Sequence, residues 1–568
     1  MTQTLQGQPI WMPAYANAGL NPTLPPLSAP NLAAFAVQQC ARYADQLAFS
    51  VVLPNGMKAQ LTYQAVNDLS DRFAAYLRQT LGLSAGERVA VQMPNSLPYP
   101  VVALGVIKAG CVLVNTNPLY TASEMIHQFN DSGAKVLVVV DLFADKLPEV
   151  LAKTQIKHVI TTEVTAFFGT VPRLIVRTVQ RYVKKMLPDI TVAHTPFKDT
   201  LRGGDVAQVK SYWQHLGPDD MVALQYTGGT TGVSKGAVLT HGNLLHNINQ
   251  MLAMVSTHTE LGKECILTAL PLYHIFAFTV NLLGFMGLGA HNVLIPSPRP
   301  IGNLQKAFET FPVTWLTGVN TLFNALLNEP WFAQNPPKTL KAAASGGTAL
   351  HHAVAQRWRD VVKAPIAEGY GLTESSPVVS FNALTGKSRD GSIGFPVPGT
   401  EVKMMDDAMQ EVALGQPGEL WVKGPQVMRG YWNNPAETDK VLHDGWLATG
   451  DIAVMDETGY IAIVDRKKDM ILVSGFNVYP NAVEDVVADM PCVAEVAVIG
   501  VPDAQTGEAV KAFVVLHPNH ASEFSKEALL AHCREKLTSY KVPKQVEVRT
   551  ELPKTPIGKV LRKNLRQT

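Results

Sequence analysis

The sequence predicts an α/β protein with more than one domain, the last of which is a small α+β unit. Its 568 residues exceed what one hydrophobic core usually spans. Two short β-branched runs, RVAVQM at 88–93 and KVLVVV at 135–140, lie on either side of a helix-like segment at 99–110. This alternation is typical of buried parallel strands joined by helices.

The C-terminal part follows a different pattern. Strand-like segments at 493–503, 508–517 and 544–553 alternate with helical ones such as SKEALLAHCREKL at 525–537. This order favours a small α+β domain. The stretch DRKKD at 465–469 consists of charged residues only, and it predicts an exposed linker where the two domains join.

The N-terminal part has no sign of a targeting segment. Residues 1–30 are rich in Pro, Ala and Asn, so we expect an irregular arm on the surface. They contain no basic region followed by an apolar core, so we expect no signal peptide. The nearest approach to a membrane span, 276–295, is interrupted by Asn281, His291 and glycines. We expect it to be buried core beside a cleft.

The overall composition favours a globular protein of the cytoplasm. With 46% hydrophobic residues, 17% charged residues and a net charge of +1, the chain has no general attraction to nucleic acid. Its cysteines lie far apart and form no CxxC pair, which favours buried, reduced thiols over disulfides or a zinc site. They are Cys40, Cys111, Cys265, Cys492 and Cys533.

One segment, 167–187, predicts a basic amphipathic helix. An apolar face would contain Phe168, Val171, Ile175, Val179, Tyr182 and Met186. The opposite face would contain Arg173, Arg177, Arg181 and Lys184. Such a helix can lie in a membrane interface. The alternative is a helix that packs its apolar face on the core and leaves a solvated basic face.

The stretch YTGGTTGVSKGA at 226–237 predicts a phosphate-binding loop. It follows a strand-like segment, and its glycines allow consecutive N–H groups to point into one concavity, which favours anions. Hydroxyl groups and Lys235 add donors and a positive charge. Lys235 follows Ser234 and precedes Gly236, so the loop does not match the GxxxxGK[ST] pattern of P-loop kinases and GTPases.

Four further motifs are compatible with nucleotide binding. Ser345, Gly346 and Gly347 form a second small-residue loop. In EGYGLTE at 368–374, Tyr370 offers a face for stacking on a base, and Glu374 offers an oxygen ligand for Mg²⁺. Asp451, expected in a turn, could accept both hydroxyls of a ribose. Lys559 follows a proline-containing turn near the C-terminal end.

Together these motifs resemble the adenylate-forming superfamily. YTGGTTGVSKGA, EGYGLTES, GWLATGD, DRKKD and PKTPIGK stand in the order of that family, and PLYHIFA at 271–277 is similar to its bacterial long-chain fatty acid–CoA ligases. The resemblance implies a large N-terminal domain, 1–465, of layered α/β subdomains with a β-barrel-like part. It also implies a small mobile C-terminal domain, 466–568, that swings about a hinge near Lys468.

The resemblance implies that the chain makes an acyl-adenylate from a fatty acid and MgATP and passes the acyl group to coenzyme A. The phosphate loop would comprise Tyr226, Thr227, Gly228, Gly229, Thr230, Thr231, Gly232, Val233, Ser234, Lys235, Gly236 and Ala237. Tyr370 and Gly371 would face adenine, with Ser345, Gly346 and Gly347 on its other side. Thr373 would contact the α-phosphate, and Glu374 and Thr230 would bind Mg²⁺.

The remaining roles follow from the same resemblance. Asp451 would bind the ribose and Arg466 the nucleotide. Lys559 would bridge the carboxylate and the α-phosphate, where charge accumulates. His274 would lie beside Tyr273 at the mouth of the acyl pocket. The swing would bring Ser474, Gly475 and Phe476 to the pantetheine channel. An acyl tunnel would be lined by Phe276, Phe278, Leu282, Gly318 and Phe323.

The sequence departs from the family at a few positions. Related enzymes commonly have His where this chain has Ala448, and they often have another pair in place of Ser375 and Ser376. We expect these changes to leave the reaction itself unaltered, but they leave the choice of substrate open. Medium-chain or aryl acids, transfer to a carrier protein, and a non-catalytic acyl-nucleotide binding protein are the alternatives. Peripheral contact with the inner membrane through 167–187, and a homodimer, are further expectations.

Overall fold

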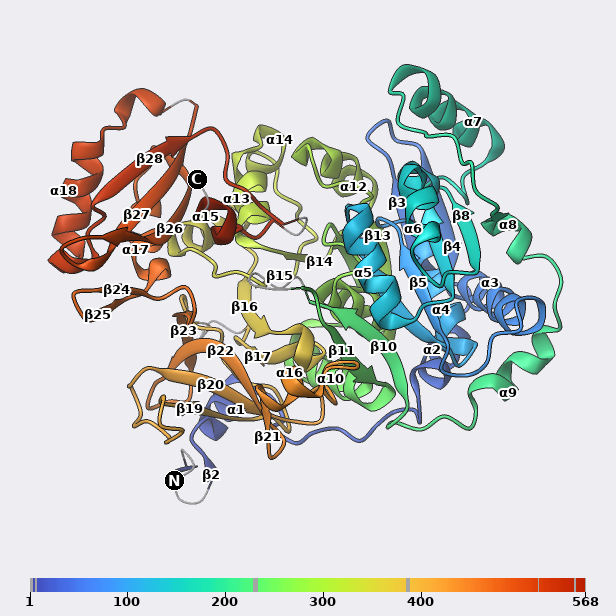
Figure 1. The fold of residues 1–568 in the computed structure, drawn as a ribbon, viewed down its shortest axis with the longest axis horizontal. Helices are drawn as coiled ribbons and strands as arrows, with labels where there is room; N and C mark the ends of the chain where they lie inside the picture. Colours follow the sequence, from blue (N-terminus) through green and yellow to red (C-terminus); the bar gives the residue numbers. More distant parts are fainter. Residues whose placement is uncertain are drawn as a thin grey trace.

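The protein is a mixed α/β structure, as the sequence predicts. The computed structural model describes residues 4–5, 8–227, 233–384, 389–518, 520–555 and 558–566. Two large sheets, a five-stranded antiparallel sheet and a C-terminal α+β unit meet around a common centre (Figure 1). A short pair, β1 (Thr4–Leu5) and β2 (Gln8–Pro9), lies near the N-terminus.

The first large sheet has seven strands in the order β11-β10-β6-β5-β7-β8-β9. All its neighbours are parallel except β10 and β11, which form an antiparallel hairpin around the phosphate loop. The strands are β5 Arg88–Gln92, β6 Val112–Thr116, β7 Val136–Val140, β8 His158–Thr162, β9 Thr195–Pro196, β10 Met221–Tyr226 and β11 Gly236–Thr240. The two strands predicted at 88–93 and 135–140 are confirmed as β5 and β7.

Helices cover both faces of this sheet. Val89 and Val91 of β5 belong to one core with α2, α3 and α4, whereas Ala90 belongs to another with α5 and α6. Burial on both faces explains why these strands are apolar throughout. The helices are α2 Leu32–Arg42, α3 Tyr63–Ala75, α4 Pro98–Lys108, α5 Ala122–Ser132 and α6 Leu147–Ala152.

The second large sheet has nine strands in the order β18-β17-β16-β15-β14-β12-β13-β3-β4. Its central strands, from β16 to β3, are parallel. The strands are β3 Leu47–Val52, β4 Lys58–Thr62, β12 Cys265–Thr268, β13 His291–Leu294, β14 Trp315–Gly318, β15 Ala342–Gly346, β16 Ile366–Gly371, β17 Val378–Phe381 and β18 Phe395–Pro396.

This sheet is also covered on both faces. Ile266 and Trp315 share a core with α10 and α11, whereas Leu267 and Leu316 share one with the helices from α12 to α15. The segment expected as buried core beside a cleft forms the π-helical η6 and α11, and this expectation is confirmed. The helices are α10 His241–Val255, η6 Ala277–Gly284, α11 Phe285–Gly287, α12 Gln305–Thr310, α13 Asn320–Asn328, α14 Pro330–Ala333 and α15 His352–Val362.

The barrel-like part expected from the family is a five-stranded antiparallel sheet, β19-β20-β22-β21 with β23 paired to β22. Asp451 lies inside β22, directly opposite Arg466 of β23, so its expected position in a turn is wrong. The sequence GWLATGD reads like a turn, but pairing on both sides extends it. The strands are β19 Glu401–Met405, β20 Gly418–Lys423, β21 Leu442–His443, β22 Trp446–Met455 and β23 Ile461–Arg466.

The C-terminal part forms the predicted α+β unit, at the upper left of Figure 1. The three predicted strands are confirmed as β26, β27 and β28, and α17 and α18 pack against each other beside them. A hairpin of β24 and β25 completes the sheet. The elements are β24 Ile471–Val473, β25 Phe476–Val478, α17 Pro480–Ala488, β26 Val493–Asp503, β27 Gly507–Leu516, α18 Lys526–Lys536, β28 Gln545–Arg549 and α19 Arg562–Leu565.

The junction at 465–469 is only partly the exposed linker that its charges predict, because Lys467 and Lys468 are exposed but its two aspartates are not. Asp465 and Asp469 are buried. Asp465 accepts a hydrogen bond from the backbone N–H of Asn481, and Arg562 lies 3.7 Å from it. Arg566 donates to Asp469 at 2.9 Å. The two carboxylates are buried because partners from the C-terminal unit satisfy them, which the local sequence does not reveal.

The N-terminal arm is only partly irregular. Residues 12–18 form α1 (Met12–Ala18), and Tyr15 is buried against Phe395 with its hydroxyl donating to the carbonyl of Pro396 at 2.6 Å. Trp11 is buried beside it. The arm is therefore part of the core beside the five-stranded sheet, because its scattered apolar residues find partners far along the chain.

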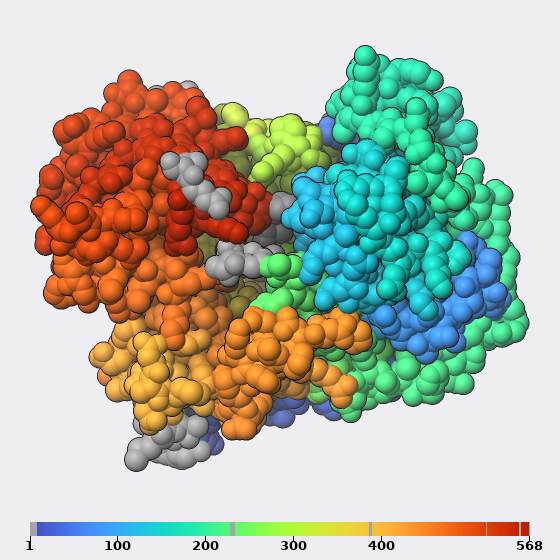
Figure 2. Space-filling view, viewed as in Figure 1, coloured from blue at the N-terminus to red at the C-terminus, as the bar shows by residue number. Residues whose placement is uncertain are grey.

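The helix predicted at 167–187 does not pack its apolar face on the core, so the alternative with a solvated basic face is wrong. It forms α7 (Thr170–Thr178) and the π-helical η3 (Val179–Val183), which protrude at the upper right in Figures 1 and 2. Two of its arginines face the protein: Arg173 pairs with Glu163, and Arg177 pairs with Asp141 and Glu163. Arg181 is exposed and pairs with Asp189. The exposed side chains include a large apolar group: Val171, Leu174, Ile175, Val179, Tyr182, Val183 and Met186.

Candidate active site

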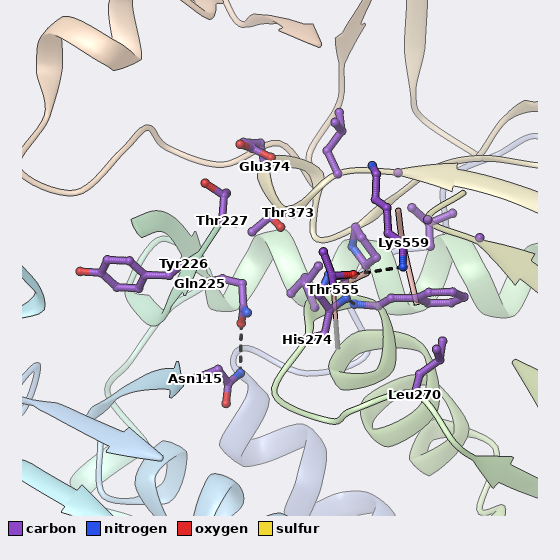
Figure 3. Close-up of a pocket in the computed structure, with 18 of the residues that line it drawn as sticks. Asn115, Gln225, Tyr226, Thr227, Leu270, His274, Thr373, Glu374, Thr555 and Lys559 are labelled. Carbon is purple, nitrogen blue, oxygen red and sulfur yellow. Dashed lines mark hydrogen bonds between the residues drawn. The ribbon is translucent and has the colours of Figure 1, made fainter. Parts of the chain in front are cut away.

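The candidate site is a cavity of about 1040 Å³ where the sheets and the C-terminal unit meet. Residues that follow β10, β14, β15 and β16 contribute to its wall, as expected for ligand sites at the carboxyl ends of parallel strands. Thr227, Thr373 and Glu374 group on one side of the view, and Lys559 and His274 on the other (Figure 3). One cavity therefore joins motifs that are far apart in the sequence.

The phosphate loop begins and ends at this cavity. Thr227, Val233, Ser234 and Lys235 line it, and the N–H of Thr227 donates to the carbonyl of Lys235 at 3.0 Å. Gly236 and Ala237 belong to β11 and support the loop rather than line the cavity. The predicted residues Gly228, Gly229, Thr230, Thr231 and Gly232 lie outside the described residues.

Tyr226 fixes the start of the loop. Its ring packs against Gly236, where a Cβ atom would lie 3.0 Å from the ring, and its hydroxyl donates to Asp131 at 2.5 Å. The ring therefore points away from the cavity centre (Figure 3). Burial and the neighbouring carboxylate raise the pKa of Tyr226, so the phenol stays protonated. The contact of Tyr226 with phosphate would have to come from its backbone.

Lys235 is already paired within the protein. Its Nζ lies 2.8 Å from Glu437 and 4.4 Å from the centre of the Tyr431 ring. Tyr431 in turn donates its hydroxyl to Oε1 of Glu374 at 2.7 Å. The predicted phosphate lysine and the predicted Mg²⁺ ligand are therefore linked through one tyrosine, and Thr373 lines the same wall.

The predicted nucleotide residues lie together. Ser345, Gly346, Gly347, Tyr370 and Gly371 all line the cavity. Tyr370 donates its hydroxyl to Oδ2 of Asp451 at 2.6 Å, which fixes the ring.

Asp451 and Arg466 extend this group. Arg466 lies 3.0 Å from Oδ1 of Asp451. Arg466 and Lys468 line both the first cavity and a neighbouring one of about 560 Å³ toward the C-terminal unit, whereas Asp451 lines only the second. The carboxylate and the tyrosine thus present one rigid polar edge between two cavities.

Lys559 reaches the first cavity from the C-terminal unit (Figure 3). Its backbone N–H donates to Oγ1 of Thr555 at 3.1 Å. Burial, and then the charge of Arg466, lower the pKa of Lys559 to about 8. Desolvation disfavours an ammonium that has no anion beside it. The position suits a lysine that receives anionic substrates.

His274 lies next to this lysine. Burial, and then the charge of Lys559, lower the pKa of His274 to about 4, so the imidazole is neutral at neutral pH. Its Nδ1 accepts a hydrogen bond from the N–H of Phe276 at 3.3 Å. The ring proton therefore resides on Nε2, and His274 can donate one hydrogen bond.

The apolar end of the cavity differs from the predicted tunnel. Of the five residues expected to line it, only Phe276 does; Phe278, Leu282 and Phe323 are buried in other contacts, and Gly318 lies against Phe323. The lining comes from α10, η6 and the central strands instead. It includes Met251, Met254, Val255, Val280, Phe285 and Trp315. The sequence window around His274 could not reveal the contribution of α10, which depends on tertiary packing.

Three predicted residues lie away from the cavity. Ser474 and Gly475 form the turn between β24 and β25, with φ values of +50° and +84°. Phe476 is exposed and stacks on Tyr540 at 4.8 Å. Lys468 lines the cavity just after β23. The structure therefore brings the predicted hinge to the site but not the predicted pantetheine residues.

Sequence reasoning missed a buried polar network beneath the loop. The amide of Asn115 donates to Gln225 at 3.0 Å, and Gln225 donates to the carbonyl of Tyr273 at 2.9 Å (Figure 3). Tyr99 donates to Asn115 at 2.7 Å. Polar residues inside otherwise apolar strands were the available signal. Tyr431 and Glu437 could not be found in this way, because neither residue belongs to a recognisable binding motif.

The departures from the family lie at or near the site. Ala448 lines the cavity between Leu447 and Thr449. Ser375 and Ser376 are buried behind Glu374, and Ser375 donates to the carbonyl of Pro377 at 2.5 Å. Ala448 therefore changes the surface of the cavity itself, whereas the serine pair supports the turn that carries Glu374.

The chain belongs to the AMP-binding enzyme family. The family model for the AMP-binding enzyme matches residues 36–432, and that for the AMP-binding enzyme C-terminal domain matches 482–559. The long-chain-fatty-acid–CoA ligase of Escherichia coli O6:H1 is 51% identical over 93% of both chains. That of Yersinia pestis is 50% identical over 92% of both.

A solved structure supports the same fold. The anthranilate CoA ligase AuaEII, crystallised in complex with anthranoyl-AMP, superimposes with a TM-score of 0.83 at 27% identity. The match covers 96% of this chain and 98% of that one. The two-part α/β fold predicted from the sequence is therefore confirmed.

Proposed function

We propose that the chain activates long-chain fatty acids to acyl-CoA through an acyl-adenylate, releasing AMP and pyrophosphate. The observation that carries this proposal is the cavity itself. Its lining includes Thr227 and Ser234 at the two ends of the predicted phosphate loop, Lys559, and an apolar end formed in part by α10. The ligases of Escherichia coli and Yersinia pestis, about half identical over nearly their whole length, support the long-chain substrate.

In the first step, a carboxylate oxygen of the acid attacks the α-phosphorus of ATP. The bond from the α-phosphorus to the bridging oxygen breaks, and pyrophosphate leaves. Lys559 would lie between the two anions and offset their repulsion, and Thr373 would hold the α-phosphate. His274 could donate a hydrogen bond from its Nε2–H to the carboxylate and orient it. Lys235 would meet the departing pyrophosphate.

The residues present fit a Mg²⁺ ion bound with ATP. Glu374 presents a carboxylate to the cavity wall, the kind of hard oxygen ligand that Mg²⁺ prefers. The ion would neutralise phosphate charge. Thr230, the second predicted ligand, lies outside the described residues. Tyr431 holds Glu374 in place through its hydroxyl.

In the second step, the thiol sulfur of coenzyme A attacks the acyl carbon. The bond from that carbon to the AMP oxygen breaks, AMP leaves, and the thiol proton is released. For this step we infer a swing of residues 466–568 relative to 1–465 about Lys468. Ser474, Gly475 and Phe476 would then approach the cavity from their present exposed position.

The test of the activity is CoA-dependent AMP release with saturated acids from about eight to about eighteen carbons, since each buried CH₂ contributes roughly 0.8 kcal/mol. We expect a maximum among the longer acids. Release with short or aryl acids alone would keep the chemistry and overturn the substrate. Release that needs a carrier protein instead of coenzyme A would overturn the acceptor.

We also propose that α7 and η3 rest on a lipid surface. Their exposed apolar side chains include Leu174 and Val183, which are 66% and 73% exposed. Lys184 and Lys185 beside them are exposed and complement anionic head groups. Because Arg173 and Arg177 face the protein, apolar insertion would contribute more than charge. In the described part of the chain, none of the helices combines the length and apolar character needed to cross a bilayer.

Vesicle co-sedimentation tests this proposal. We expect the pair Leu174→Asp and Val183→Asp to abolish binding to anionic vesicles, whereas Leu261→Asp, at another exposed leucine, leaves binding unchanged. Lys184→Glu with Lys185→Glu should weaken binding less. If the first pair sediments as the parent does, the surface is not a membrane contact.

A further inference from the structure

The segment that follows β20 lies beside β11, the strand that leaves the phosphate loop. The N–H of Val238 donates to the carbonyl of Gly430 at 2.9 Å, and the N–H of Trp432 donates to that of Gly236 at 2.7 Å. These bonds fix the start of α16 (Pro435–Asp439) beside the loop. Glu437 of α16 lines the candidate active site as a result.

Glu437 places a negative charge beside Lys235, where the proposed function puts a phosphate group. Its Oε2 lies 2.8 Å from Nζ of Lys235, and its Oε1 lies 2.5 Å from Nζ of Lys440. The hydrogen bonds from these two lysines lower the pKa of Glu437 to about 2, so it is a carboxylate at neutral pH. A carboxylate beside a phosphate site repels the phosphate, so its presence there needs a functional explanation.

The fold does not require this carboxylate. The N-terminus of α16 is capped by Asn434, whose side chain accepts from the N–H of Glu437 at 3.2 Å. Thr438 bonds both the N–H of Tyr431 and the carbonyl of Asn434. Other groups therefore fix the backbone of the segment, and the ion pair of the carboxylate with Lys235 is not needed for its fold.

We propose that Glu437 is a positioning residue that competes with pyrophosphate for Lys235. This inference rests on the proposed function, in which Lys235 meets the departing pyrophosphate. When the β- and γ-phosphates are present, the ammonium of Lys235 turns from Glu437 to them. When pyrophosphate leaves, Glu437 takes the ammonium back. The competition weakens the hold on the product and so favours its release.

The competition has a measurable size. An ion pair between partly exposed side chains is weak, and we expect its loss to change the dissociation constant by about fivefold. Glu437→Gln keeps the shape and a hydrogen bond to Lys235 but removes the charge. We therefore expect this variant to bind pyrophosphate about fivefold more tightly than the parent. Glu437→Asp, which keeps the charge, should restore weak binding.

Calorimetric titration of the full-length protein with magnesium pyrophosphate tests the proposal without any turnover. The set comprises the parent, Glu437→Gln, Lys235→Met, the double variant and Glu149→Gln. Glu149 pairs with Lys153 at 2.9 Å on the exposed surface of α6, so its variant is a matched control. The melting temperature of each variant shows that it is folded.

The double variant separates competition from simple repulsion. If Glu437 acts through Lys235, Glu437→Gln tightens binding in the parent background and has no effect when Lys235 is Met. Unchanged or weaker binding by Glu437→Gln overturns the proposal, and so does tightening that persists without Lys235. Failure of the parent to bind pyrophosphate would instead overturn the phosphate role assigned to Lys235.

Discussion

Two lysines of the same cavity are held in contrasting ways. Lys235, from the phosphate loop, is paired with Glu437 at 2.8 Å and lies over the ring of Tyr431. Lys559 comes from the C-terminal unit. Within the described part of the chain, its ammonium has no hydrogen-bond acceptor and no ion-pair partner, and burial lowers its pKa to about 8.

The contrast separates two tasks. A desolvated cation without a protein anion gains most when substrate anions arrive, so Lys559 can act where charge accumulates in the transition state. Lys235 must give up Glu437 before it can serve a phosphate, so its net gain is smaller. The first lysine suits the chemical step, and the second suits the binding and release of phosphate groups.

The largest effect should come from Lys559→Ala. We expect the rate of ATP–pyrophosphate exchange to fall by about a hundredfold to a thousandfold, because the site loses the buried cation that we assign to the reacting centre. The measurement is exchange with a long-chain acid, with Lys526→Ala on α18 as the control. An unchanged rate would remove Lys559 from the reaction and erase the contrast.

Lys235→Ala should have a smaller effect of a different kind. We expect the KM for ATP to rise by about tenfold with a lesser change in kcat, since a phosphate contact present in both the ground and transition states affects binding uniformly. Initial rates of AMP release over a range of ATP concentrations measure this. A loss in kcat as large as that of Lys559→Ala would show that the two lysines share one task.

The smallest effect concerns pH. Because burial and Arg466 lower the pKa of Lys559 to about 8, its ammonium loses the proton as the pH rises through that value. We expect kcat/KM for adenylation to fall above about pH 8, since this parameter reports the free enzyme. Nearby Asp451 opposes the shift, whereas Arg562 and Lys468 add to it.

Lys559→Arg sharpens the same test, because a guanidinium stays charged throughout this range. The variant will be slower, but its kcat/KM should remain level where that of the parent declines. If both decline together above about pH 8, another group causes the alkaline limb.

Local motifs could be predicted from the sequence, and long-range partners could not. Short apolar runs in the sequence predict the strands β5 and β7. A local cluster of glycines predicts the loop after β10. The burial of Asp465 depends on Asn481 and Arg562, which lie in another part of the fold. A short stretch of sequence does not show which opposite charges the fold will bring together, so this burial could not be predicted.

The amphipathic helix and the acyl end show the same limit. Periodicity identified the two faces of 167–187, but which face meets the protein depends on Glu163 and Asp141. Likewise, Met251 and Met254 line the cavity because α10 packs against η6. The roles of the predicted site residues stay predictions, although most of the described ones lie around one cavity.

The buried cysteines have a consequence for a protein that makes activated acyl groups. All five are buried, and none lines either of the two cavities described above. Burial raises the pKa of Cys111 and Cys265 to about 12, so these side chains hold no thiolate at neutral pH. A mixed anhydride formed at Lys559 would meet no sulfur nucleophile of the chain itself. The chain's own thiols are thereby kept from the acyl group, and the thiol offered to the intermediate is the one that the substrate brings.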